Sequence, residues 1–210
     1  MLPALNVRVA VVRQQGKRRL AIMSADGTNS RTLATAIEIQ GVVGQGTADW
    51  SPDGTWIVTG GTEGQVQGLF KIPVDGGAPV RLVSGEARNP VWSPKGDLIV
   101  YAVPFARAGG RDGLRGVTPE GAPVHFPEVQ VRLGGAHRFL RNGAGLVYLP
   151  GLETKDFWLV DLTTNTLRQL THLTDRGYLN TFDTTPDGKH LVFDRSRQNS
   201  DVVLIELQKK

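Results

Sequence analysis

The sequence contains no cysteine, which excludes a disulfide framework, a thiolate nucleophile and a cysteine-ligated zinc site. It also lacks a long apolar run. Val7–Val12 is interrupted by Arg8, and even the uninterrupted run Leu98–Val103 is far shorter than the roughly 20 residues that span a bilayer. We therefore expect no membrane insertion by either segment.

Catalytic motifs are missing as well. The sequence has no Gly-x-Ser-x-Gly motif and no Walker loop, and the glycines of Gly41–Gly46 have the wrong spacing for a dinucleotide loop. The four histidines are not paired at the spacing of metal ligands. These absences predict a chain that is not itself an enzyme and that uses neither a cofactor nor a metal ion.

Charges of one sign form no long run, and the nearest approach to a cluster, Arg13, Lys17, Arg18 and Arg19, reads as an exposed hairpin tip. Twenty-four basic and twenty acidic residues are spread along the chain, and the formal net charge is +4. A nucleic-acid-binding domain gathers its basic side chains on one face. We therefore expect no nucleic-acid partner.

A four-residue turn motif is the clearest positive feature. Ser51–Gly54 (SPDG) returns as Ser93–Gly96 (SPKG) and Thr185–Gly188 (TPDG), with a degenerate copy at Leu140–Gly143 (LRNG). The final glycines lie 42, 47 and 45 residues apart, and an apolar run follows each copy. A period in the low forties with a strand–turn–strand centre is typical of β-propeller blades.

Each repeat unit contains the pattern of a four-stranded antiparallel meander. In one unit the strands are a short segment ending at Trp50, then Trp56–Thr59, Gly68–Val74 and Pro79–Val83, with a glycine-rich loop after the second strand. The sequence predicts one all-β domain with about five blade positions, three complete and two partial. The repeat units are residues 7–46, 47–86, 87–134, 135–178 and 179–207.

The two partial blades would leave open strand edges. Open edges invite pairing with other strands. Three explanations fit: the partial blades complete each other, the chain is the C-terminal part of a longer polypeptide, or the edges pair in an oligomer. We expect the second.

One slot of the repeat is aromatic. Trp50, Trp92 and Phe139 occupy the same position, where the last unit has Thr184. An aromatic side chain that recurs once in each blade fills the core between blades. We therefore interpret the two indoles as packing residues rather than as a ligand platform.

The motif resembles the WD40-like repeat of TolB-type propellers. The matching segments are Trp50–Val58, Trp92–Val100 and Thr184–Val192, and the resemblance extends from Val7 to Leu207. It implies a bacterial β-propeller. It does not imply one function, because the same repeat builds TolB and the propeller domains of prolyl-oligopeptidase-like serine peptidases.

The candidate site lies where the innermost strands begin. Loops that lead into these strands form one rim of the central channel, where polar groups can converge on a ligand. The candidate residues just before or within the inner strands are Thr47, Asp49, Arg88, Asn89, His137, Asn180 and Asp183.

Two functions of different class fit the pattern. The first is a non-enzymatic module that presents its rim to a protein or peptide partner. The second is a propeller accessory to a peptidase or kinase domain that this chain does not contain. The sequence leaves the compartment open: an upstream signal or membrane segment would place the domain on the extracytoplasmic side of a bacterial membrane, and otherwise it would be cytoplasmic.

Overall fold

In a computed structural model the chain forms five antiparallel sheets in chain order. The structure describes residues 7–40, 47–104, 111–132, 137–150, 156–174, 178–185 and 187–196. Blade 1 contains β1 (Val7–Gln14), β2 (Lys17–Ser24) and β3 (Arg31–Leu33). Blade 2 contains β4 (Ile37–Ile39), β5 (Ala48–Trp50), β6 (Trp56–Glu63), β7 (Val66–Pro73) and β8 (Val80–Ser84).

The remaining sheets follow the same plan. Blade 3 contains β9 (Arg88–Trp92), β10 (Ile99–Pro104), β11 (Arg111–Val117), β12 (Pro123–Val124) and β13 (Gln130–Arg132). Blade 4 contains β14 (His137–Phe139), β15 (Gly145–Tyr148), β16 (Trp158–Asp161) and β17 (Thr166–Gln169), and blade 5 contains β18 (Tyr178–Thr184) and β19 (Leu191–Ser196).

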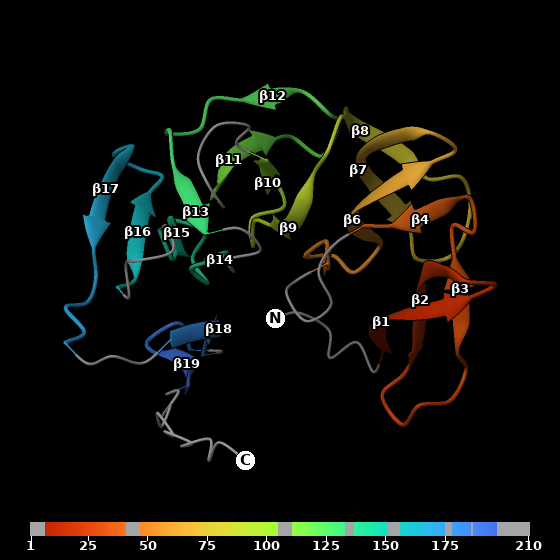
Figure 1. The fold of residues 1–210 in the computed structure, drawn as a ribbon, viewed down its shortest axis with the longest axis horizontal. Coiled ribbons are helices and arrows are strands. Elements are labelled where there is room, and N and C mark those ends of the chain that lie inside the picture. The colour runs from red at the N-terminus through yellow and green to blue at the C-terminus, as the bar shows by residue number, and fades with distance from the viewer. Residues whose placement is uncertain are drawn as a thin grey trace, which may run out of the picture.

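The blades are arranged along an arc. In Figure 1 they run from β1–β3, over β6–β8 and β9–β12, to β18 and β19, with β9, β14 and β18 towards the centre and β8, β12 and β17 towards the outside. This arrangement confirms the prediction of an all-β partial propeller with three complete blades between two partial ones.

The repeated turn has the same hydrogen bonds in all four copies. In the first copy the backbone N–H of Ser51 donates to the carbonyl of Trp56, and that of Gly54 donates to the carbonyl of Ser51, both at 2.9 Å. The same pair of bonds recurs at Ser93, Leu140 and Thr185. The four final glycines have φ between 66° and 82°, a left-handed conformation in which glycine carries no Cβ penalty.

In the two copies that contain an aspartate, its carboxylate adds hydrogen bonds to the turn. Oδ1 of Asp53 accepts hydrogen bonds from Oγ of Ser51 at 2.6 Å and from the backbone N–H of Thr55 at 3.0 Å. These bonds favour the carboxylate and lower the pKa of Asp53. Asp187 receives equivalent bonds from Thr185 and Lys189. Both carboxylates therefore cap backbone N–H groups of their turns.

The core consists of apolar clusters between successive blades. Ile57 and Phe70 of blade 2 pack with Leu20 and Ile22 of blade 1. The opposite face of blade 2 packs on blade 3 in a cluster that includes Trp92. Two further clusters join blade 3 to blade 4 and blade 4 to blade 5. Each complete blade thus buries one face against the preceding blade and the other against the following blade.

The aromatic slot lies in these clusters. Trp50, Trp92, Phe139 and Thr184 pair in the same register with the second strands of their blades. Trp92 and Phe139 are buried, and each is 7% exposed. Trp50 is half-buried against the cluster between blades 1 and 2, because the described part of blade 1 contributes no inner strand beside it. Both indoles therefore pack in the clusters between blades, as expected.

Some expected details were wrong. The glycine-rich segment after Thr59 is not a loop, since β6 continues to Glu63 and pairs with β7 along its whole length. Two short strands were also missed. Ile37–Ile39 lies in the expected first repeat unit but pairs with β6 of blade 2. Gln130–Arg132 pairs with β11, which also pairs with β10 and β12. The expected strand Val202–Leu207 lies outside the described residues.

One face of blade 5 is uncovered by the rest of the described chain. In each of blades 2 to 5, the residue just before the aromatic slot pairs with a valine of the second strand. These valines are Val58, Val100, Val147 and, in blade 5, Val192. The first three side chains are fully buried, whereas Val192 is 61% exposed. In the complete blades this face packs against the next blade.

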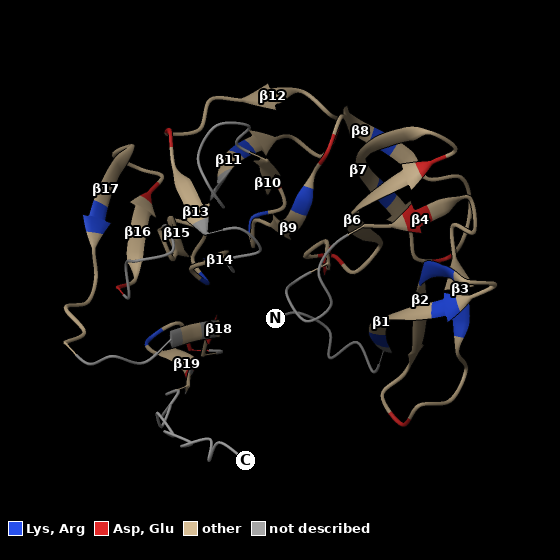
Figure 2. Ribbon diagram, in the orientation of Figure 1, with Lys and Arg blue, Asp and Glu red and all other residues tan. Residues whose placement is uncertain are grey.

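Charged residues are distributed over all five blades. Figure 2 shows segments of Lys and Arg and segments of Asp and Glu spread over the arc, with Lys and Arg on the strands of blade 1. In the part of the chain that the structure describes, no helix has the length and hydropathy needed to cross a membrane.

Candidate binding site at the centre of the arc

A cavity of about 370 Å³ opens where the inner strands of four blades converge. Its volume is at the lower end of the range of small-molecule and peptide pockets. Strands β5, β9, β14 and β18 and the turns after β9 and β14 supply the lining. The lining residues are Ala48, Asp49, Pro90, Val91, Trp92, Pro94, Arg138, Phe139, Arg141, Asp183 and Thr184.

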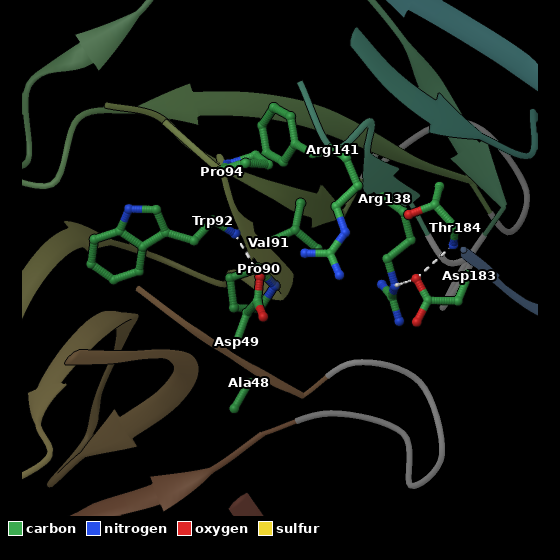
Figure 3. Close-up of a pocket in the computed structure, with 11 residues that line it drawn as sticks. Ala48, Asp49, Pro90, Val91, Trp92, Pro94, Arg138, Arg141, Asp183 and Thr184 are labelled. Atoms are coloured by element: carbon green, nitrogen blue, oxygen red, sulfur yellow. Dashed lines mark hydrogen bonds and ion pairs between the residues drawn. The ribbon is translucent and has the colours of Figure 1, made fainter. Parts of the chain in front are cut away.

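Asp49 forms one wall of the cavity and joins two blades. Its Oδ1 accepts the backbone N–H of Trp50 at 2.9 Å, and its Oδ2 accepts that of Trp92 in blade 3 at 2.7 Å. Burial raises the pKa of Asp49, although these two donors act in the opposite direction. Both carboxylate oxygens are therefore engaged by the fold itself. Figure 3 shows the bond to Trp92.

Asp183 lies at the equivalent position of blade 5. Its Oδ1 accepts the backbone N–H of Thr184 at 2.8 Å, the same local bond that Asp49 makes. Nε of Arg138 lies 3.9 Å from this oxygen, and the Asp183 side chain is 75% exposed. This is a long ion pair in contact with solvent, and such pairs contribute little to stability.

Arg138 and Arg141 bring two guanidinium groups to the cavity. Arg138 lies in β14, and its Nη1 donates to the carbonyl of His137 at 2.9 Å. Arg141 lies in the following turn, and its aliphatic part runs against the turn of blade 5, where a Cβ on Gly188 would meet Arg141 Cβ at 3.2 Å. In Figure 3 both side chains extend into the space between Asp49 and Asp183.

The structure brings two of the seven predicted residues to the cavity, Asp49 and Asp183. Thr47 is half-buried, and its carbonyl accepts Oγ1 of Thr59 at 2.8 Å. Nε of Arg88 donates to Oε1 of Glu86 at 2.7 Å, and Arg88 is not among the lining residues.

The other three predicted residues do not line the cavity. Asn89 is buried and has a φ of 45°. His137 is fully buried beside Arg138. The backbone of Asn180 lies in β18, and its side chain is outside the described part of the structure.

Sequence reasoning missed Arg138 and Arg141, although the repeat marks both. Arg138 precedes the aromatic slot, as Asp49 and Asp183 do in their blades. Arg141 stands in the turn where the other copies have proline, including Pro52 and Pro94. An alignment of the chain with itself could therefore have found both arginines as charged departures from the repeat.

Together, the radial sheets, the identical turns and the clusters between blades define a β-propeller of the TolB-like kind. The structure of TolB from Acinetobacter baumannii is similar to this chain, with a TM-score of 0.74 and 15% sequence identity. The similarity covers 95% of this chain and 50% of the TolB chain. The chain thus spans about half the length of that TolB.

Other propellers are similar to a lesser degree. A structure of a nidogen/laminin complex matches with a TM-score of 0.64 at 13% identity, over 91% of this chain and 68% of that one. A puromycin-hydrolyzing peptidase from Mycobacterium tuberculosis matches with a TM-score of 0.57 at 14% identity, over 88% of this chain and 34% of the peptidase. No protein-family model and no curated protein matches the sequence. At these identities the similarities show the fold alone.

Proposed function

We propose that this domain is a non-enzymatic binding module that holds a peptide segment of a protein partner at its central cavity. The observation that supports the proposal is the convergence of four inner strands on one opening with both charged and apolar walls. In binding sites a few precisely placed polar groups fix the orientation of the ligand, and polar groups make up most of the lining of this cavity. Val91, Phe139 and Pro94 supply the apolar part here, and the two arginines and two aspartates supply the polar part.

The fixed position of Asp49 also supports binding. Backbone N–H groups of two blades hold both of its carboxylate oxygens, so this wall of the cavity loses little conformational freedom when a ligand binds. Among the described residues no group of three His, Asp or Glu side chains is placed to hold a metal ion. The proposal therefore needs only contacts that the chain itself provides.

The absence of cysteine allows a clean test. Thr184 lines the cavity, whereas Thr166 is exposed on the outer strand β17. Random-sequence peptides displayed on phage would be selected on the purified domain and then tested against Thr184→Cys and Thr166→Cys, each modified with a bulky maleimide. We expect the modification at Thr184 to abolish binding of the selected peptides and the modification at Thr166 to leave it intact. Equal binding to both modified proteins would disprove the proposed site.

A second candidate function is that of a propeller accessory to a peptidase. The similarity to peptidases that contain propellers favours it, although this chain matches only about a third of their length. Such a propeller would guide many unrelated extended chains to a catalytic domain. It therefore predicts selected peptides without a shared motif, whereas a partner-specific module predicts one motif.

A further inference from the structure

We propose that the cavity recognises a carboxylate of the bound peptide, with the Arg141 guanidinium as its principal donor and Arg138 as the second. This inference rests on the proposed function and names the chemical group that the site selects. A guanidinium presents parallel N–H donors that match the two oxygens of a carboxylate.

Arg141 is the residue whose charge the fold does not use. Both oxygens of Asp49 accept backbone N–H groups. Arg138 lies near Asp183 and donates to a backbone carbonyl. Within the described ranges, no carboxylate or carbonyl contacts the guanidinium of Arg141 closely enough for a hydrogen bond or ion pair. A positive charge in a cavity lined by Val91, Phe139 and Pro94 thus remains available to a ligand (Figure 3).

The repeat itself shows that this arginine is not needed for the turn. Pro52 and Pro94 occupy the same position in copies that make the same two backbone hydrogen bonds. The turn of blade 4 therefore forms with either residue type. An arginine at this point adds a charged group at the mouth of the cavity without adding a bond that the fold requires.

The charge balance of the cavity favours a carboxylate over a phosphate. Asp49 and Asp183 lie in the same lining as the two arginines, so the four side chains sum to no net charge when all are ionised. A ligand with a single negative charge gains the contact with Arg141 at limited repulsion from the aspartates. A phosphate with close to two negative charges is attracted by the arginines and repelled by the aspartates about twice as strongly, so in a lining of no net charge it gains little and gives up more hydration.

The test uses three N-acetylated peptides and phosphate ion as probes of the whole chain. The peptides are N-acetyl-Leu-Glu-Leu-amide, its Gln counterpart, and the Gln counterpart with a free C-terminal carboxylate. Binding is followed by NMR through the arginine Nε–H and tryptophan indole N–H signals. We expect at least one peptide with a carboxylate to bind about tenfold more tightly than the neutral peptide and more tightly than phosphate. The two acidic peptides distinguish a side-chain from a C-terminal carboxylate.

Variants then locate the contact. Arg141→Pro restores the residue of the other copies and Arg141→Gln keeps a long polar side chain, and we expect both to lose the tenfold preference. Arg168→Gln, on the exposed strand β17, is the matched control and should keep it. Asp183→Asn should strengthen binding severalfold, because it removes a negative charge beside Arg138.

The outcomes separate this inference from the proposed function. Neutral and acidic peptides of equal affinity, or an acidic preference that survives in both Arg141 variants, would overturn the carboxylate inference while leaving a peptide site in place. Stronger binding of phosphate would overturn it as well. Failure of the carboxylate probes to bind at millimolar concentration would also reject it, whereas the proposed function fails only in the maleimide experiment.

Discussion

Oδ2 of Asp49 accepts a 2.7 Å hydrogen bond from the backbone N–H of Trp92, 43 residues further along the chain. The bond joins the inner strands of blades 2 and 3 at the edge of the cavity. Oδ1 of the same carboxylate accepts the N–H of Trp50. Asp49 therefore links the backbones of Trp50 and Trp92, the aromatic-slot residues of two adjacent blades. The wall of the candidate site and the contact between blades are therefore built by one side chain.

Asp49→Asn should lower the free energy of unfolding by about 1–3 kcal/mol. An amide oxygen can replace only one of the two acceptors, so one backbone N–H loses its partner. Urea-induced unfolding measures the change. Asp183→Asn is the matched control: its side chain is exposed and accepts one backbone bond, so its effect should stay within about 0.5 kcal/mol. Equal losses in the two variants would contradict the role given to the bond between blades.

The Asp49 variant should also change the dependence of stability on pH. Burial raises the folded-state pKa of Asp49 above the unfolded value of 3.8. Between these two pKa values Asp49 is protonated more often in the folded state than in the unfolded state. The free energy of unfolding therefore falls as pH rises through this window. Above the folded-state pKa the contribution of Asp49 no longer changes with pH. The difference between parent and Asp49→Asn, measured from pH 3 upwards, should therefore shrink with rising pH across this window. A difference that grows with pH in the window would show that the pKa is lowered instead.

Trp92→Ala should destabilise the domain by about 3–5 kcal/mol, as expected for truncation of a large buried side chain. The indole is 7% exposed and packs between blades 2 and 3 with Val58 and Leu69. Trp50→Ala removes a half-buried indole at the same slot and should cost less. Thermal unfolding of both variants provides the comparison, and a Trp92→Ala protein that melts with the parent would refute this packing role.

Val147→Ala and Val192→Ala should differ strongly although the two valines occupy the same place in their blades. Loss of two buried methyl groups at Val147, which is fully buried, should cost about 2 kcal/mol. At Val192, which is 61% exposed, the cost should stay within about 0.5 kcal/mol. Chemical denaturation of the isolated chain decides the point. A large cost at Val192 would mean that another surface covers this face in solution.

The repeat made the fold predictable. Four turns of one pattern placed the hairpins, and the register of the aromatic slot placed the inner strands, because both depend on local sequence. The two missed strands have no such signal. Ile37–Ile39 and Gln130–Arg132 are three residues long, and they form because a long neighbouring strand offers a free edge, which is a tertiary effect.

The candidate site was only partly predictable for a related reason. Asp49 and Asp183 were found because inner-strand polar residues converge on the channel. Arg88 and Asn89 belong to the same strand end, but Arg88 pairs with Glu86 and Asn89 turns inward with a left-handed backbone. Which side of a strand end faces the channel depends on twist and local conformation, and the sequence period does not determine either.

Gly60→Ala tests the closest approach between two blades. Gly60 lies in β6, and a Cβ at this position would lie 2.0 Å from the carbonyl oxygen of Ala87 at the start of blade 3. Backbone would have to move to admit the methyl group, so we expect a loss of about 1–3 kcal/mol or more. Ala102 occupies the equivalent position in blade 3, since it follows Val100 by two residues, as Gly60 follows Val58. The reverse substitution can therefore be made at Ala102. Ala102→Gly there should cost about 0.5–1 kcal/mol through chain entropy alone. Unfolding of the two variants in urea gives both values. A Gly60→Ala protein as stable as the parent would show that blades 2 and 3 are further apart than this contact requires.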